Sequence, residues 1–197
     1  MFVIIKVKKC IGHKNLYVLF TFDSSGNVQY ERVLDFIKPP GGRTFFNEWS
    51  CVATDDGDLI IQNPGEKLYV CDSGGNLKSC LLISEMLPHL ACATDQNEII
   101  IHTISDVLLL TKEGEIKRKI TVDGFIESVT FNYVTSKIEV LVHKKKLSLG
   151  RLSNFILSYS ENEEIECLGS CEGRPNTFCS HPAGTTALVF FNKIIYT

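Results

Sequence analysis

The chain has 197 residues, of which 44% are hydrophobic and 22% charged, and its formal net charge is −3. This length and composition are ordinary for one globular domain or repeat array and argue against extensive disorder. The slight negative charge excludes a general attraction to nucleic acid, which would need a local basic patch. No apolar run approaches the roughly 20 residues of a membrane helix. The apolar run at 2–5 is short and precedes its lysines, unlike a signal peptide. We therefore expect one cytoplasmic domain over 1–197 without a membrane span.

The first strand-like runs lie at 16–22 and 30–36, and the turn-forming sequence DSSGN at 23–27 separates them. Short runs rich in Val, Leu, Tyr and Phe, bounded by turn residues, are typical of β-strands. We predict that 1–36 supplies the last two strands of a partial repeat unit.

The loop at 37–49 is the longest irregular segment, and it combines an arginine with three aromatic residues. Aromatic residues and arginine dominate the energetics of protein interfaces. We therefore expect Arg43, Phe45, Phe46 and Trp49 to bind a partner. The alternative is that the aromatic side chains pack under their own loop.

The strongest signal is a repeat with a period of about forty residues. VATD at 52–55 is followed by GDLII, and CATD at 92–95 is followed by NEIII. Each unit continues with an apolar run and a glycine-containing turn. The two units span 50–83 and 90–121, and their predicted strands lie near 50–54, 58–62, 67–71, 77–83, 90–94, 98–102, 107–111 and 116–121.

A longer unit follows at 125–169, and a partial unit at 176–197 ends the chain. Four-stranded units at this period are the signature of propeller blades, because each sheet buries its faces against its neighbours. We predict an all-β propeller of antiparallel blades, about four to five in number. The end pieces could complete one shared blade that closes the ring, or the chain could be a fragment of a six-bladed ring.

The sequences GDLII at 57–61, KLYVCD at 67–72 and GNL at 75–77 resemble a blade of the NHL-repeat family, as carried by TRIM-NHL proteins. The chain departs from the family at QNPG and HTIS, where NHL blades usually place Asp and Asn. The resemblance implies a non-catalytic propeller that binds a protein partner, as part of a larger adaptor or ubiquitin ligase.

In propellers, the inter-blade connections lie on one rim with the turns between the second and third strands. We therefore expect Asn63, His102 and Arg174 to share a partner-binding face with the loop at 37–49.

A basic stripe runs from 112 to 151, where nine lysines and arginines stand against five acidic residues. Its centre is Lys144, Lys145 and Lys146, with Arg151 close by. Such a stripe could bind RNA phosphates. It could equally be a solvated outer strand whose lysines protect a sheet edge. The acidic stretch at 161–172 follows it and could either pair with the basic stripe or repel nucleic acid.

Eight cysteines in a reducing compartment behave mostly as small buried hydrophobic residues. Cys167, Cys171, Cys179 and His181 are the right ligand types for tetrahedral zinc, but their spacing matches no standard finger or knuckle. We predict free thiols, no metal and no cofactor, with a zinc site at this cluster as the alternative.

The sequence favours binding over catalysis. A lactonase-like hydrolase needs a metal held from several blades, and only Asn63 and Asp106 are candidates for it. DSGG at 72–75 resembles the nucleophile motif of chymotrypsin-like proteases, in which a histidine and an aspartate precede the serine. Only His13 precedes Ser73, so we interpret the motif as a hairpin turn.

Binding through the loop and binding through the basic stripe predict different effects of substitutions. We expect Arg43→Ala/Phe46→Ala to weaken partner binding by about 2 kcal/mol or more. Lys144→Ala/Lys145→Ala/Lys146→Ala should change mainly the association rate and salt dependence. The measurement is the affinity of both folded variants for a partner recovered by pull-down. Loss of binding by the lysine triple variant alone would favour RNA.

Overall fold

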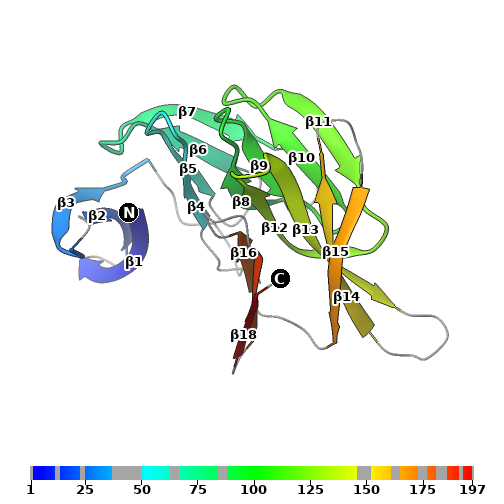
Figure 1. Ribbon diagram of the computed structural model, residues 1–197. Helices are drawn as coiled ribbons and strands as arrows, with labels where there is room; N and C mark the ends of the chain where they lie inside the picture. The colour runs from blue at the N-terminus through cyan, green and yellow to red at the C-terminus, as the bar shows by residue number, and fades with distance from the viewer. Residues whose placement is uncertain are drawn as a thin grey trace. The chain divides into compact units, whose positions relative to one another are not determined.

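A computed structural model describes the chain at 2–11, 14–22, 25–36, 50–62, 67–83, 88–145, 152–160, 165–172, 177–180, 186–190 and 193–196. All regular structure in these ranges is β, and it forms five antiparallel sheets (Figure 1). The chain divides into two compact units, Met1–Met86 (unit 1) and Leu87–Thr197 (unit 2), which are described separately.

Unit 1 contains a three-stranded and a four-stranded sheet. The three-stranded sheet has the order β1 (Phe2–Ile11), β2 (Lys14–Phe22), β3 (Val28–Val33). The four-stranded sheet has the order β4 (Ser50–Ala53), β5 (Leu59–Gln62), β6 (Lys67–Cys71), β7 (Leu77–Leu82). The N-terminal sheet thus has one strand, β1, more than the sequence predicted.

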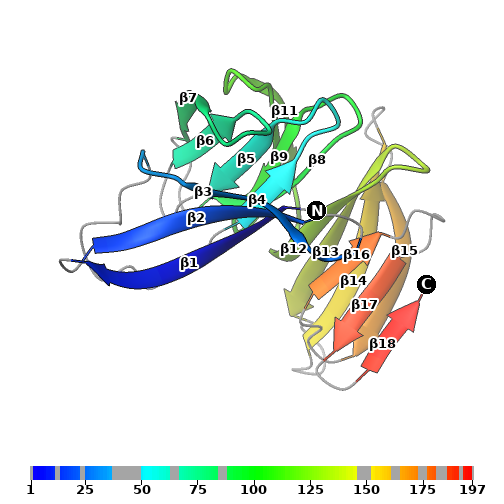
Figure 2. The ribbon, with the colours of Figure 1, turned by 90° about the vertical axis from the view of Figure 1, so that its left-hand side faces the viewer.

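Unit 2 contains two four-stranded sheets and a three-stranded sheet (Figure 2). The first is β8 (His89–Ala93), β9 (Ile99–His102), β10 (Asp106–Leu110), β11 (Ile116–Thr121). The second is β12 (Phe125–Asn132), β13 (Lys137–Lys145), β14 (Leu152–Tyr159), β15 (Ile165–Glu172). The third is β16 (Thr177–Ser180), β17 (Thr186–Phe190), β18 (Lys193–Tyr196).

These strands confirm the all-β fold class, and those of the two central repeats agree with the prediction to within about one residue. Each terminal group, β1–β3 and β16–β18, forms a three-stranded sheet.

The same five-residue turn closes four of the hairpins. In the turn after β4, the amide of Thr54 donates to the carbonyl of Asp58 at 2.9 Å, and that of Gly57 donates to the carbonyl of Thr54 at 3.0 Å. Equivalent bonds close the turns that begin at Asp72, Thr94 and Thr111. The fourth residue of the turn needs a positive φ, which glycine and asparagine tolerate best. Gly57 has φ 88°, and Asn97 occupies the same place with φ 61°.

The second strand of each central repeat forms the core. Leu59–Ile61 of β5 and Ile99–Ile101 of β9 are fully buried, so both faces of these strands are covered. The fourth strands β7 and β11 are largely exposed and share one burial pattern, with a single buried residue near the end. The solvent exposure of each sheet therefore increases from its buried inner strands to its exposed fourth strand, as in stacked blades.

An arginine links the neighbouring sheets within each unit. Arg32 of β3 donates from Nη1 to the carbonyl of Gly74 at 2.8 Å, and Arg118 of β11 donates from Nη2 to the carbonyl of Ser160 at 2.9 Å. Both donors lie on the last strand of one sheet, and both acceptors follow the third strand of the next. An equivalent contact between adjacent sheets therefore occurs in both units.

Gly75 allows this close approach, because its φ is +73° and an added Cβ would lie 3.1 Å from Leu19 Cδ2 and 3.2 Å from Arg32 Cδ. We predict that Gly75→Ala destabilises unit 1 by about 1 kcal/mol more than Gly57→Ala. Gly57 is the matched control, since its φ is +88° but nothing lies within 4 Å of an added Cβ. Urea unfolding measures both variants, and equal losses would show that the packing at Gly75 contributes nothing.

Candidate functional site

The connection from β11 to β12 lies against the turn from β9 to β10, and we call these two segments, 102–106 and 122–126, the rim of unit 2. The amide of Val122 donates to the carbonyl of Ser105 at 2.8 Å, and that of Ile126 donates to the carbonyl of Ile104 at 2.7 Å. Because backbone hydrogen bonds fix both segments, the side chains that they present are held at one edge of two adjacent sheets.

Two large apolar side chains are exposed on the rim. Ile104 is 52% and Phe125 60% exposed, although each stands next to buried residues of its own segment. Gly124 between the two sheets has φ +138°, and an added Cβ would lie 2.5 Å from Val142 Cγ1 and 3.0 Å from the carbonyl of His143. The connection is therefore held tightly against β13, and Phe125 extends from a rigid support.

Two histidines flank these apolar residues. His89 of β8 pairs directly opposite His102 of β9, and their rings stack with centroids 5.3 Å apart and planes at 22°. His102 Nδ1 lies 3.0 Å from the carbonyl of Thr103, to which it donates in the tautomer that carries the proton there. Burial lowers the pKa of His102 to about 4, and His89 contributes to the same shift against the opposing hydrogen bond. The ring is therefore neutral near pH 7.

Each carboxylate of the rim pairs with a lysine on a neighbouring strand. Lys119 lies 3.2 Å from Asp106, which also accepts a hydrogen bond from the hydroxyl of Thr121 at 2.8 Å. Lys144 lies 2.9 Å from Asp123. Exposed pairs of this kind contribute little stability, but they leave a rim with apolar groups at its centre and balanced charge around them.

The structure describes only one of the partner-binding residues that the sequence predicted. His102 lies on the rim, beside an inter-sheet connection and a turn between second and third strands. The other predicted residues lie outside the part of the chain that the structure describes: Arg43, Phe45, Phe46, Trp49, Asn63 and Arg174. The sequence analysis did not identify Ile104 or Phe125 as binding residues. Ile104 could have been recognised, because it is an apolar residue in a predicted turn.

Four described lysines of the basic stripe pair with acidic residues, and Lys119 and Lys144 are two of them. Besides Lys144, Lys117 pairs with Glu98 at 2.5 Å and Lys137 with Glu166 at 3.1 Å. Lys145 is placed only by its backbone in β13, and Lys146 and Arg151 lie outside the described residues. A phosphate would have to compete with these carboxylates.

The described thiols are of two kinds. Burial raises the pKa of Cys51 to about 11 and the pKa values of Cys71 and Cys92 to about 12, which keeps these thiols protonated. Cys80 and Cys167 are exposed. Within the described ranges, no three His, Cys, Asp or Glu side chains gather as metal ligands.

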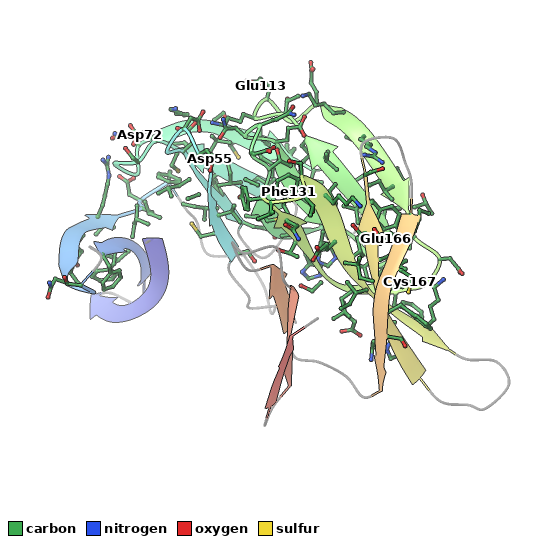
Figure 3. The ribbon with its side chains drawn as sticks, viewed as in Figure 1. Asp55, Asp72, Glu113, Phe131, Glu166 and Cys167 are labelled. Carbon is green, nitrogen blue, oxygen red and sulfur yellow. The ribbon has the colours of Figure 1, made fainter. Side chains whose placement is uncertain are left out.

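A small hollow lies among the described residues of unit 2. A hollow of about 40 Å³ between the two four-stranded sheets of unit 2 is lined by Asp95, Arg118 and Tyr159 among others. That volume suits one or two water molecules. The sequence motif DSGG at 72–75 lies in a hairpin turn, closed by the amide of Asp72 donating to the carbonyl of Asn76 at 2.9 Å. Figure 3 shows Asp72 at this turn.

Comparisons with known proteins identify the fold. No protein-family model matches the chain, and no curated protein does. Among solved structures, the WD40 domain of Neurospora crassa Pan2 is similar with TM-score 0.61 and 13% identity, over 93% of this chain and 58% of that one. Kuenenia stuttgartiensis hydrazine synthase is similar with TM-score 0.57 and 12% identity, over 74% of this chain and 44% of that one.

A protein of unknown function from Bacteroides caccae is also similar, with TM-score 0.56 and 12% identity, over all of this chain and 72% of that one. The chain thus spans about half the length of the Pan2 and hydrazine synthase chains. It has a β-propeller fold. The four-stranded sheets are its blades, and identities this low show the fold alone.

We predict that the half-buried His102 of the rim makes unit 2 sensitive to acid. The pKa of His102 is lowered to about 4 in the folded protein and is about 6.5 in an unfolded chain. The unfolded state therefore binds the proton first, and stability should fall as pH drops between these values, by up to about 3 kcal/mol. Urea unfolding across this range should show a smaller fall for His102→Gln than for wild type. Ile116→Ser, which changes no ionisable group, is the control and should retain the wild-type dependence. An unchanged slope in His102→Gln would contradict the assignment.

Proposed function

We propose that this chain is a non-catalytic β-propeller platform, and that a protein partner binds to the rim of unit 2. The observation that supports this most directly is the pair of exposed side chains Ile104 and Phe125, which two inter-sheet backbone hydrogen bonds hold at one edge. Rigid apolar anchors surrounded by charged groups are the usual anatomy of a protein interface.

The surroundings of the two anchors support a protein ligand in particular. The ion pairs Lys119–Asp106 and Lys144–Asp123 border the apolar centre with equal numbers of positive and negative groups. Such a border can align with charges of either sign on a partner surface and fix its register. The fixed connection at Gly124 also lowers the entropic cost of binding, because less of the rim has to become ordered.

We also propose, on the NHL-like sequence pattern, that the propeller is the recognition part of a larger cytoplasmic adaptor or ubiquitin ligase. The loop at 37–49, with Arg43, Phe45, Phe46 and Trp49, stays a second proposed contact for the same partner. The propeller fold supports the platform in general, and the finer family assignment rests on the sequence resemblance. The described residues include no helix that is both long enough and apolar enough to cross a bilayer.

RNA binding is the alternative, and the ion pairs of the basic stripe weigh against it. Four described lysines of the stripe already lie within 3.2 Å of a carboxylate. Contacts to phosphates strengthen binding through the release of counterions from the nucleic acid. Neighbouring carboxylates reduce that gain, because they neutralise the lysines and repel the phosphates.

A lactonase-like hydrolase is weaker still as an alternative. Of its two candidate ligands, Asn63 lies outside the described residues. Asp106 is engaged by the ammonium group of Lys119 and the hydroxyl of Thr121, so a metal would have to displace both groups.

The rim hypothesis predicts a selective loss of binding. Ile104→Ser/Phe125→Ser should weaken the partner complex by about 2 kcal/mol or more, roughly thirtyfold in Kd. The partner is first identified by affinity capture and mass spectrometry, then purified, and its Kd is measured by calorimetry. The matched control is Ile116→Ser/Val134→Ser, which changes two residues of similar exposure, 52% and 58%, at the opposite edge of the same sheets.

The control decides what a loss means. Wild-type affinity in the control, with equal thermal stability of both variants, supports the rim. Equal loss in both variants, or full affinity in the rim variant, contradicts it.

A further inference from the structure

The outer edges of the sheets are protected unequally. An edge strand presents unpaired backbone groups, and proteins usually block such edges with lysine, proline or short strands. The last strands of the other sheets each carry at least one lysine or arginine, in β3 (Arg32), β7 (Lys78), β11 (Lys117, Arg118, Lys119) and β18 (Lys193). The eight residues of β15, IECLGSCE, include no lysine, arginine or proline. This strand therefore lacks the usual protection.

The side chains of β15 are also open to solvent. Ile165 is 63% and Leu168 38% exposed. All described side chains from Ile165 to Ser170 are exposed or half-buried, whereas β7 and β11 each have a buried residue that anchors them. Figure 3 shows Glu166 and Cys167 on this strand. Within the described residues β15 pairs with β14 alone, so its other edge faces outward.

The register of β15 leaves a regular segment available. A bulge at Leu168 separates the pairs Leu157–Cys167 and Ile156–Gly169, and from Gly169 to Glu172 the pairing with β14 is uninterrupted. Bulges bend a strand locally. The segment after the bulge can therefore receive another strand in regular register, with Leu168 at its start.

The charge of the chain around β15 indicates which kind of segment pairs with this strand. The chain between 152 and 173 contains five acidic residues and no lysine or arginine. Glu166 on the strand is 62% exposed even though Lys137 lies 3.1 Å away. A second copy fits poorly, because it would bring an identical segment with five acidic residues and no lysine or arginine beside the first. Like charges on adjacent strands destabilise their pairing.

We propose that β15 is a docking edge for an extended, basic segment of a protein partner, which adds to the sheet as a fifth strand. Backbone hydrogen bonds supply affinity without regard to sequence, and alternate side chains supply specificity. Lysine or arginine side chains of the segment lie beside the glutamates, and apolar side chains lie beside Ile165 and Leu168. This surface adds a further contact to the proposed platform, at a place distinct from the rim.

The test uses a defined peptide in place of the native partner. The probe is a fluorescein-labelled peptide of alternating lysine and valine, about nine residues long to match a strand. Fluorescence anisotropy should detect binding to the wild-type protein. Proline in place of every second valine keeps the charge and removes amide donors, and it should raise Kd about tenfold or more. Glutamate in place of lysine should abolish binding.

Variants of the chain locate the site. Leu168→Lys introduces the missing edge lysine, and it should raise the Kd of the lysine–valine peptide about tenfold. The matched control is Ile116→Lys on β11, where an apolar residue of similar exposure is changed on an already basic edge; its Kd should equal that of wild type. Hydrogen exchange should show added protection of β15 amides when the peptide binds.

The outcomes separate this proposal from the rim. Equal affinity for the proline peptide, equal loss in Ile116→Lys, or no protection of β15 overturns strand addition, whatever the rim variant shows. Ile104→Ser/Phe125→Ser should bind the peptide like wild type, so failure of the rim hypothesis leaves this result unchanged. Loss of peptide binding in the rim variant, with its fold intact, would place the site at the rim and overturn the docking edge.

Discussion

Burial of the second strand of each repeat on both of its faces is the constraint on which the rest of the structure depends. Ile60 and Ile100 stand at equivalent places in β5 and β9, and neither has any exposed surface. A single sheet cannot bury both faces of a strand, so each sheet needs neighbours. The arginine links from Arg32 and Arg118 then fix how adjacent sheets meet within a unit.

The two proposed contacts lie where this constraint ends. At the rim, the chain leaves one sheet and enters the next, and its backbone is satisfied by Ile104 and Ser105 of the neighbouring turn. Apolar side chains that point outward there have no further layer to cover them. Within the described part of the chain, β15 pairs with β14 on one side only. Exposed apolar groups at such places are therefore available for binding instead of folding.

Acidic residues have different roles in the two places. On the rim, Asp106 and Asp123 neutralise lysines, so the apolar centre is bordered by balanced charge. Around β15, the sequence between 152 and 173 contains five acidic residues and no lysine or arginine. The same residue type therefore favours a neutral, shape-selected contact at the rim and a charge-selected one at the outer strand.

The sequence by itself determined the repeat and the strands and turns of the two central units, because these depend on local patterns: glycine or asparagine at the positive φ of Gly57 and Asn97, and short apolar runs between such turns. It also placed His102 at the end of a strand. Only the tertiary structure decided that Ile104 and Phe125 share an edge and that Lys144 is neutralised by Asp123. Those facts depend on contacts between separate sheets, and no local pattern in the sequence encodes which side chains such contacts leave exposed.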